Sequence, residues 1–155
     1  MNLDDSIPLW FNFGYWRNCT TFVEAAKATA TLVADKGKFA SNDIVLGTNS
    51  YFTRFTKDVG FGCGDAAIYW HNNFGVDVMG LNIAPHQVRI AQNRVEKLGL
   101  TDHIFLKLGS ANDIQLHFPN KQFTKICSID SAYHFFPSRN YFFHQGIYNL
   151  AFSVC

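Results

Sequence analysis

Residues 58–65 have the sequence Asp-Val-Gly-Phe-Gly-Cys-Gly-Asp, and this stretch decides the fold. Glycine occupies alternate positions at Gly60, Gly62 and Gly64, and a helix-like segment at 66–71 follows directly. Glycines in this pattern allow a sharp turn and let a ligand approach the backbone without meeting a Cβ atom. The stretch therefore predicts a strand-to-helix turn that binds a ligand, with a turn of purely geometric purpose as the alternative.

The spacing of these glycines differs from two common phosphate-binding loops. It is not the GxGxxG pattern that places a pyrophosphate on a helix N-terminus, and no GK[ST] follows, as a P-loop requires. Asp65 stands where the anion would lie, and its charge opposes an anion there. A cationic ligand is therefore favoured.

Strands and helices alternate along the chain. Thr21 and Glu24 form a capping-box pattern, Gly37 ends the helix that they begin, and Pro85 opens a second well-marked helix that ends at Gly99. A last helix is expected at 138–150. Apolar runs predict four buried strands, at 44–46, 76–83, 104–108 and 125–129. This alternation is typical of an α/β fold with a parallel sheet, in which ligands bind at the carboxyl ends of the strands.

Composition excludes several classes of protein. The 155 residues suffice for one domain, 48% of them are hydrophobic, and the net charge is +1. These values argue against disorder and against binding to nucleic acid or an anionic membrane surface. No apolar run reaches the roughly 18 residues of a membrane span. The acidic N-terminus differs from a targeting peptide, so a cytoplasmic location is expected.

Metal and disulfide sites are not predicted. The cysteines show no CxxC pair and the histidines no HxxxH pair, so neither a zinc site nor a disulfide framework is expected. The cysteines are Cys19, Cys63, Cys127 and Cys155, and the histidines are His71, His86, His103, His117, His134 and His144.

Five motifs in order resemble one family. DVGFGCGD at 58–65 resembles the D-V-G-x-G-x-G motif of class I S-adenosylmethionine-dependent methyltransferases. GLNIAPHQ at 80–87 resembles the motif after the second strand in the branch of cyclopropane-fatty-acid synthases, sterol C-methyltransferases and related small-molecule enzymes. Further matches lie at 12–16, 109–113 and 128–135.

The resemblance implies a Rossmann-like parallel sheet of the seven-stranded type, ordered 3-2-1-4-5-7-6. It also implies S-adenosylmethionine as cofactor and methyl transfer to a small-molecule or lipid acceptor. Tyr133 and His134 would face the acceptor, with His134 as the candidate base. The implied cofactor-binding residues are Tyr15, Trp16, Asp58, Gly60, Gly62, Cys63, Gly64, Asn82, Ile83, Gln87, Ser110, Ala111, Asn112, Ile129 and Asp130.

Within this set, the glycines would wrap the methionine part of the cofactor, and Asn82 and Gln87 would hold the ribose hydroxyls. Residues 110–112 would border the adenine, and Tyr15 and Trp16 would close over the cofactor. Simpler roles stay open: Gln87 as a solvated side chain, Asn82 as a strand-end turn residue, and the aromatic residues as core.

Two departures from the family pattern stand out. Residues 47–57 separate Val45-Leu46 from Asp58-Val59, and removing these eleven residues restores the continuous motif. The chain also ends after the helix expected to follow the fourth strand. We therefore expect one partial methyltransferase domain, with a helical cap segment at 1–40 and the cofactor-binding half at 41–155. A bare fourth strand would favour self-association.

Two other functions are weighed against methyl transfer. The first is an inactive fragment or pseudoenzyme that at most binds the cofactor. The second is a Rossmann-type nucleotide binder, against which the glycine spacing argues.

Overall fold

The computed structural model describes residues 8–49, 61–110, 114–119 and 123–129. These residues form a four-stranded, fully parallel sheet in the order β3-β2-β1-β4. This confirms the predicted parallel α/β fold and matches the first four strands of the expected seven-stranded order. The elements are α1 (Phe22–Gly37), β1 (Ile44–Asn49), α2 (Asp65–Phe74), β2 (Asp77–Asn82), α3 (Pro85–Lys97), β3 (Ile104–Leu108), α4 (Ile114–His117) and β4 (Lys125–Ile129).

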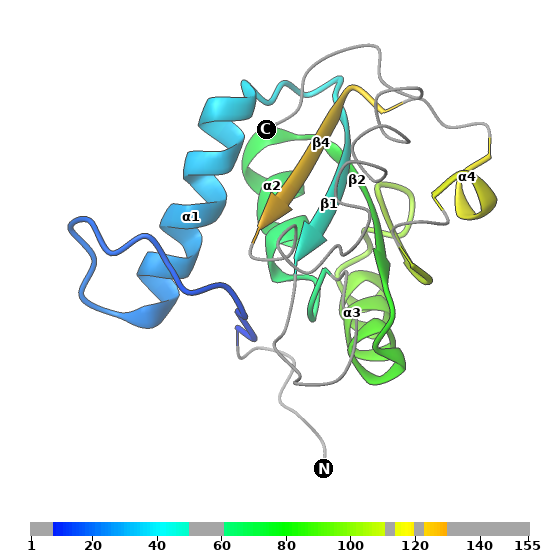
Figure 1. Ribbon diagram of the computed structural model, residues 1–155, viewed down its shortest axis with the longest axis horizontal. Coiled ribbons are helices and arrows are strands. Elements are labelled where there is room, and N and C mark those ends of the chain that lie inside the picture. Colours follow the sequence, from blue (N-terminus) through cyan, green and yellow to red (C-terminus); the bar gives the residue numbers. More distant parts are fainter. Residues whose placement is uncertain (1–7, 50–60, 111–113, 120–122, 130–155) are drawn as a thin grey trace.

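The helices cover the sheet from two sides. Apolar residues of α1, α2 and α3 share one buried cluster with Val45, Val78 and Ile104 of the strands. A second cluster, on the other face, joins Leu46 and Met79 to α4 and the segment after it. Figure 1 shows α1 and α4 on opposite sides of the sheet.

The strands that follow β1 in the chain are added to the sheet on both sides of it. From β1 the chain proceeds to β2 and β3 on one side, and β4 then pairs with the opposite edge of β1. Such a change of side is the switch point where open α/β sheets bind ligands, at the carboxyl ends of the strands.

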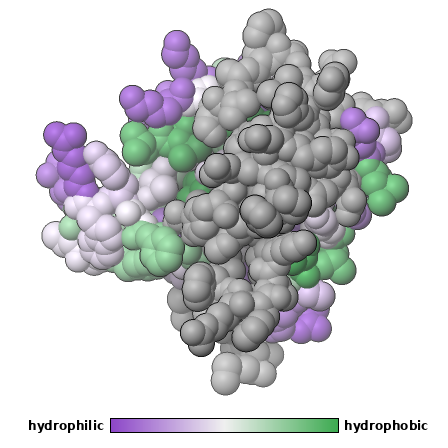
Figure 2. Space-filling view, in the orientation of Figure 1, coloured by the Kyte–Doolittle hydropathy of each residue, from purple (hydrophilic) through white to green (hydrophobic). Residues whose placement is uncertain are grey.

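Helix α1 lies close to its neighbours because its inner side is built from alanine. The buried residues include Ala26, Ala30 and Ala34, and Trp70 of α2 donates a 2.9 Å hydrogen bond from Nε1 to the carbonyl oxygen of Ala30. The exposed residues of α1 include Glu24, Lys27, Asp35 and Lys36. Figure 2 shows hydrophilic (purple) atoms at the upper end of α1 and hydrophobic (green) atoms below them. Small buried residues on one side and polar residues on the other are what an amphipathic surface helix requires.

The first turn of α1 contains the predicted capping box. Thr21 Oγ1 accepts a 3.3 Å hydrogen bond from the amide of Glu24, and Glu24 Oε2 accepts a 3.0 Å hydrogen bond from the amide of Thr21. Thr20 donates to the same carboxylate oxygen from both its amide and its hydroxyl, at 2.9 Å each. These bonds lower the pKa of Glu24 to about 2.

The lowered pKa of Glu24 makes the stability of the chain dependent on acid pH. Its contribution is present above the unfolded pKa of 4.5 and is lost as the pH falls toward about 2. We therefore expect Glu24→Gln to lower the melting temperature at pH 7, and the gap to the unmodified chain to narrow below pH 4.5. Melting curves between pH 7 and pH 3 measure this. Glu96→Gln, at an exposed position of α3, is the control, and a gap of constant size would contradict the capping role.

Strand β1 is longer than the sequence predicts. Gly47, Thr48 and Asn49 continue the strand and pair with residues 127–129 of β4. The strand predicted at 44–46 was therefore too short at its carboxyl end, and the insert expected at 47–57 stays a prediction. A Cβ atom at Gly47 would lie 3.0 Å from the Trp70 ring, so glycine lets α2 pack directly on the strand.

Other differences are small. The single-turn helix α4 was not predicted, because one turn leaves no periodic apolar pattern to detect. The helix expected at 138–150 lies outside the described residues. Within the part of the chain that the structure describes, no helix combines the length and apolar character needed to cross a bilayer.

Candidate functional site

The glycine turn joins the carboxyl end of the sheet to α2. The amide of Gly64 donates a 3.1 Å hydrogen bond to the carbonyl oxygen of Phe61, which closes the turn. Gly62 has φ +57° and Gly64 has φ +88°, in the left-handed region that glycine alone adopts without cost. A Cβ atom at Gly64 would lie 3.2 Å from Cβ of Ala91 in α3. Both conformation and packing therefore require glycine at this position.

A buried ion pair supports the turn. Asp65, the first residue of α2, receives hydrogen bonds from Arg94 of α3: Nη1 to Oδ2 at 2.8 Å and Nη2 to Oδ1 at 2.9 Å. Arg94 Nη1 also donates to the carbonyl oxygen of Cys63 at 2.7 Å. Burial lowers the pKa of Arg94, but the hydrogen bonds and charge of Asp65 outweigh burial, so its pKa is raised overall.

This pair corrects the electrostatic expectation for the turn. Because Arg94 neutralises Asp65 with two hydrogen bonds, Asp65 presents no free negative charge to a ligand. The same bonds occupy the guanidinium, so Arg94 is not free to bind a phosphate either. The turn is therefore close to neutral.

Cys63 contributes its backbone to the turn rather than a reactive thiol. Its side chain is buried, and burial together with the charge of Asp65 raises the pKa of Cys63 to about 11, although Arg94 acts in the opposite direction. The thiol is therefore protonated at neutral pH, and only a thiolate is an effective nucleophile.

Asn82 and Gln87 lie together beside the turn. Asn82, the last residue of β2, is 1% exposed, and its Nδ2 donates to Gln87 Oε1 at 2.9 Å and to the carbonyl oxygen of Gly62 at 3.4 Å. Its Oδ1 accepts from the amide of Ala84 at 3.0 Å. Asn82 is thus a turn residue, as the simpler alternative proposed, and it also orients Gln87. Because Gln87 Oε1 accepts this hydrogen bond, the side-chain nitrogen Nε2 of Gln87 is not part of the contact with Asn82.

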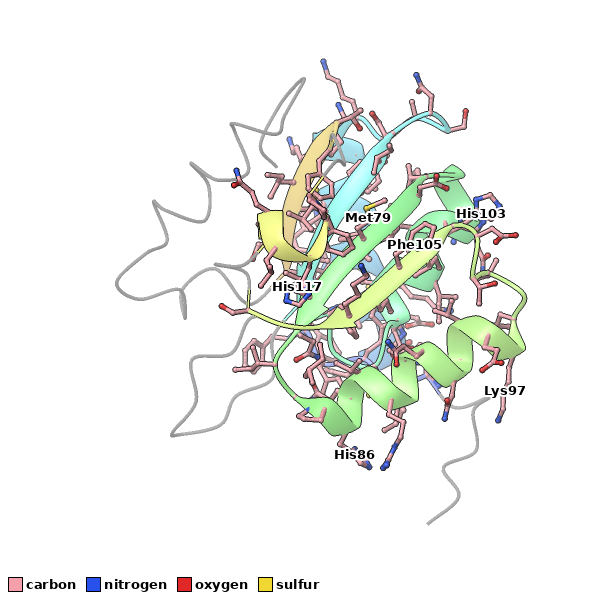
Figure 3. The ribbon with its side chains drawn as sticks, turned by 90° about the vertical axis from the view of Figure 1, so that its right-hand side faces the viewer. Met79, His86, Lys97, His103, Phe105 and His117 are labelled. Atoms are coloured by element: carbon pink, nitrogen blue, oxygen red, sulfur yellow. The ribbon has the colours of Figure 1, made fainter. Side chains whose placement is uncertain are left out.

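The remaining described candidates cluster at the same edge of the sheet. Ile129 ends β4 and pairs with Asn49 at the end of β1. The amide of Gly109 donates to the carbonyl oxygen of Asn82 at 3.0 Å, which holds the half-buried Ser110 beside β2. Ile83 follows β2 directly. Figure 3 shows His117 of α4 at this end of β3, with His86 beyond it at the start of α3.

Tyr15 and Trp16, which were predicted to close over the cofactor, lie in the N-terminal segment beside the start of α1, and their role stays a prediction. The amide of Tyr15 donates to the carbonyl oxygen of Ala25 at 2.8 Å, and the Trp16 ring packs against Phe22. Their side chains are 39% and 53% exposed.

Two earlier residues contact the turn. The amide of Leu9 donates to Asp65 Oδ1 at 3.1 Å. A Cβ atom at Gly62 would lie 3.0 Å from the Phe11 ring. Phe11 therefore fills the space that the missing side chain of Gly62 leaves.

Seven predicted site residues lie outside the described residues and stay predictions, namely Asp58, Gly60, Ala111, Asn112, Asp130, Tyr133 and His134. Sequence reasoning in turn missed Leu9, Phe11 and Arg94. For Arg94 a signal existed: it is three positions after Ala91, on the apolar side of α3, where a charged residue needs a buried partner.

Comparisons with known proteins identify the family. A model of the family described as "Methyltransferase domain" matches residues 57–150, and thus begins at the last residue of the expected insert. The chain is 31% identical over 135 residues to erythromycin 3''-O-methyltransferase of Saccharopolyspora erythraea, covering 86% of this chain and 40% of that protein. It is 28% identical over 131 residues to cyclopropane-fatty-acyl-phospholipid synthase of Escherichia coli, covering 84% of this chain and 29% of that protein.

A solved structure agrees with the fold. Mycolic acid cyclopropane synthase CmaA1, complexed with SAH and CTAB, superposes with a TM-score of 0.74 at 20% identity, covering 93% of this chain and 46% of that chain. The expected cofactor, S-adenosylmethionine, agrees with these findings. This chain spans less than half the length of each of these three proteins. By its sequence and its sheet, the chain belongs to the methyltransferase domain family.

Proposed function

We propose that this chain binds S-adenosylmethionine at the carboxyl ends of its strands and takes part in methyl transfer to a small-molecule or lipid acceptor. The observation that carries the proposal is the contact of Asn82 with both the glycine turn and Gln87. Because Asn82 donates to the Gln87 oxygen, the two N–H donors of the Gln87 amide are not used in this contact. Ribose hydroxyls can accept hydrogen bonds from such donors.

The charge at the turn favours this cofactor over a dinucleotide. A pyrophosphate needs a cation or a free helix N-terminus. Here the N-terminus of α2 carries Asp65, and the nearby Arg94 is bound to it. S-adenosylmethionine has no phosphate and bears a positive sulfonium, so a neutral turn suits it.

Methyl transfer from a sulfonium requires little of the protein beyond aligning the reacting groups. When bound, the cofactor supplies an activated methyl group on its sulfonium. The residues of this chain would orient it: Gly62 and Gly64 would let it approach the turn without meeting a Cβ atom, and Gln87 would offer hydrogen-bond donors. Holding the reacting groups in line lowers the entropic part of the barrier. Tyr133 and His134 are proposed to face the acceptor, with His134 as base where the acceptor must lose a proton.

Calorimetric titration with S-adenosylhomocysteine tests the cofactor site. We expect the 155-residue chain to bind this ligand, and Gln87→Ala to bind it about fivefold to tenfold more weakly, because one or two hydrogen bonds are lost. Gln115→Ala, at an exposed position of α4, is the matched control and should bind as the unmodified chain does.

Two outcomes would contradict the proposal. Tighter binding of NADH than of S-adenosylhomocysteine would indicate a nucleotide binder. Equal affinity of the Gln87→Ala and Gln115→Ala variants would remove Gln87 from the site. Binding without transfer to any tested acceptor would instead favour the alternative of a cofactor-binding pseudoenzyme.

A further inference from the structure

Three possible metal ligands meet at the amino ends of β2 and β3, far from the glycine turn. His71 comes from the last turns of α2, Asp77 opens β2, and His103 precedes β3. One ligand atom from each lies within 4.8 Å of the other two. Figure 3 shows His103 at the end of the sheet opposite to His86 and His117. We propose that His71, Asp77 and His103 form a site for a divalent transition-metal ion such as Zn²⁺.

His71 is oriented as a metal ligand would be. Its Nδ1 lies 2.9 Å from the carbonyl oxygen of Val76. A carbonyl oxygen only accepts hydrogen bonds, so Nδ1 is the donor, and in the neutral imidazole this tautomer leaves the lone pair of Nε2 for a metal ion. Histidines that bind metals use this arrangement, in which a hydrogen bond from the second ring nitrogen fixes the tautomer and the ring orientation.

His103 and Asp77 supply the other two ligands. His103 Nδ1 lies 2.9 Å from Asp77 Oδ1. Ligand atoms bound to one tetrahedral zinc ion at about 2.0–2.1 Å lie about 3.3 Å apart, so an ion can replace the shared proton after a small separation of the pair. The two imidazole rings are stacked with centroids 4.5 Å apart, which places His71 beside this pair.

The backbone around the cluster is fixed, whereas the side chains remain accessible. The amide of Asp77 donates to the carbonyl oxygen of Asp43, and the carbonyl oxygen of His103 accepts from Val78. The side chains of His103 and Asp77 are 50% and 40% exposed. An ion can therefore enter, small side-chain rotations can close the site, and water can complete the coordination.

The donor set indicates the class of ion. Two imidazole nitrogens and one carboxylate suit zinc, copper, nickel or iron, whereas magnesium and calcium prefer oxygen ligands throughout. Sequence spacing could not reveal the site, because His103 and Asp77 are 26 positions apart and the sheet brings them together. A bound ion would cross-link α2, β2 and the turn before β3.

Titration of the full chain with Zn²⁺ against a chromophoric chelator tests the site. We expect His103→Asn and Asp77→Asn each to weaken Zn²⁺ binding at least about tenfold, since each removes a ligand. His86→Asn, at an exposed position at the start of α3, is the matched control and should bind Zn²⁺ as tightly as the unmodified chain.

The change in melting temperature on adding Zn²⁺ is a second test, because each variant is compared with itself even where the substitution lowers its stability. Zn²⁺ should raise the melting temperature of the unmodified chain and of His86→Asn, but not of His103→Asn, because only a ligand that binds the folded state stabilises it. Equal Zn²⁺ affinity in all variants, or no Zn²⁺ binding by the unmodified chain, would overturn the proposal. An equal response to Mg²⁺ would overturn the assignment of the ion class.

Discussion

Replacing Arg94 by methionine should lower the free energy of unfolding by about 3–5 kcal/mol, the usual effect of removing one partner from a buried ion pair. The substitution leaves the carboxylate of Asp65 buried with the amide of Leu9 as its remaining described hydrogen-bond donor. It also removes the donor to the carbonyl oxygen of Cys63. Urea denaturation followed by circular dichroism measures the loss.

Two further variants make this result interpretable. Arg89→Met places the same change at an exposed position of α3 and should change stability by about 0.5 kcal/mol or less. Asp65→Asn combined with Arg94→Met removes the buried charge and should recover part of the lost stability. A loss in Arg94→Met as small as that in Arg89→Met would show that the pair does not support the turn.

Gly64→Ala should both destabilise the chain, by about 2–3 kcal/mol, and weaken the binding of S-adenosylhomocysteine at least about tenfold. The new Cβ atom meets a strained backbone, at φ +88°, and a neighbour in Ala91 at 3.2 Å. Relief of that contact must move the turn or α3, and either movement displaces the backbone that is proposed to hold the cofactor. Urea denaturation and calorimetry measure the two effects.

Gly99→Ala separates backbone strain from packing. Gly99 also has a positive φ, +68°, but a Cβ atom there would have nothing within 4 Å. We expect this control to cost about 1 kcal/mol and to leave ligand binding unchanged. If both variants lose equal stability and both bind normally, the contact with Ala91 contributes nothing to the site.

The sequence predicted the sheet well because its strands are short apolar runs with clear ends. The runs at 104–108 and 125–129 coincide with β3 and β4, and the capping box at Thr21 starts α1 as expected. Strand β1 was less predictable, because Gly47, Thr48 and Asn49 lack the apolar character of a buried strand. Pairing with β4 extends the strand through them.

The contacts that shape the site were harder to predict, because they join residues distant in the sequence. Arg94 and Asp65 are 29 positions apart, and Leu9 is 56 positions from Asp65. Motif resemblance proposed Asn82, Gln87 and the glycines as site residues, since each lies within a short continuous motif. It gave no information on the residues that support them from other elements.

The pairing of β1 with β4 has a consequence for biosynthesis. Ile44 of β1 and Thr124, just before β4, exchange hydrogen bonds across 80 positions of the chain. At about 5–20 residues per second, a ribosome needs roughly 4–16 s to add that length. One edge of β1 therefore stays unpaired until β4 has been synthesised, which happens after β2 and β3 have been made. During that interval a nascent chain exposes an unpaired strand edge, the kind of surface on which other extended segments can pair.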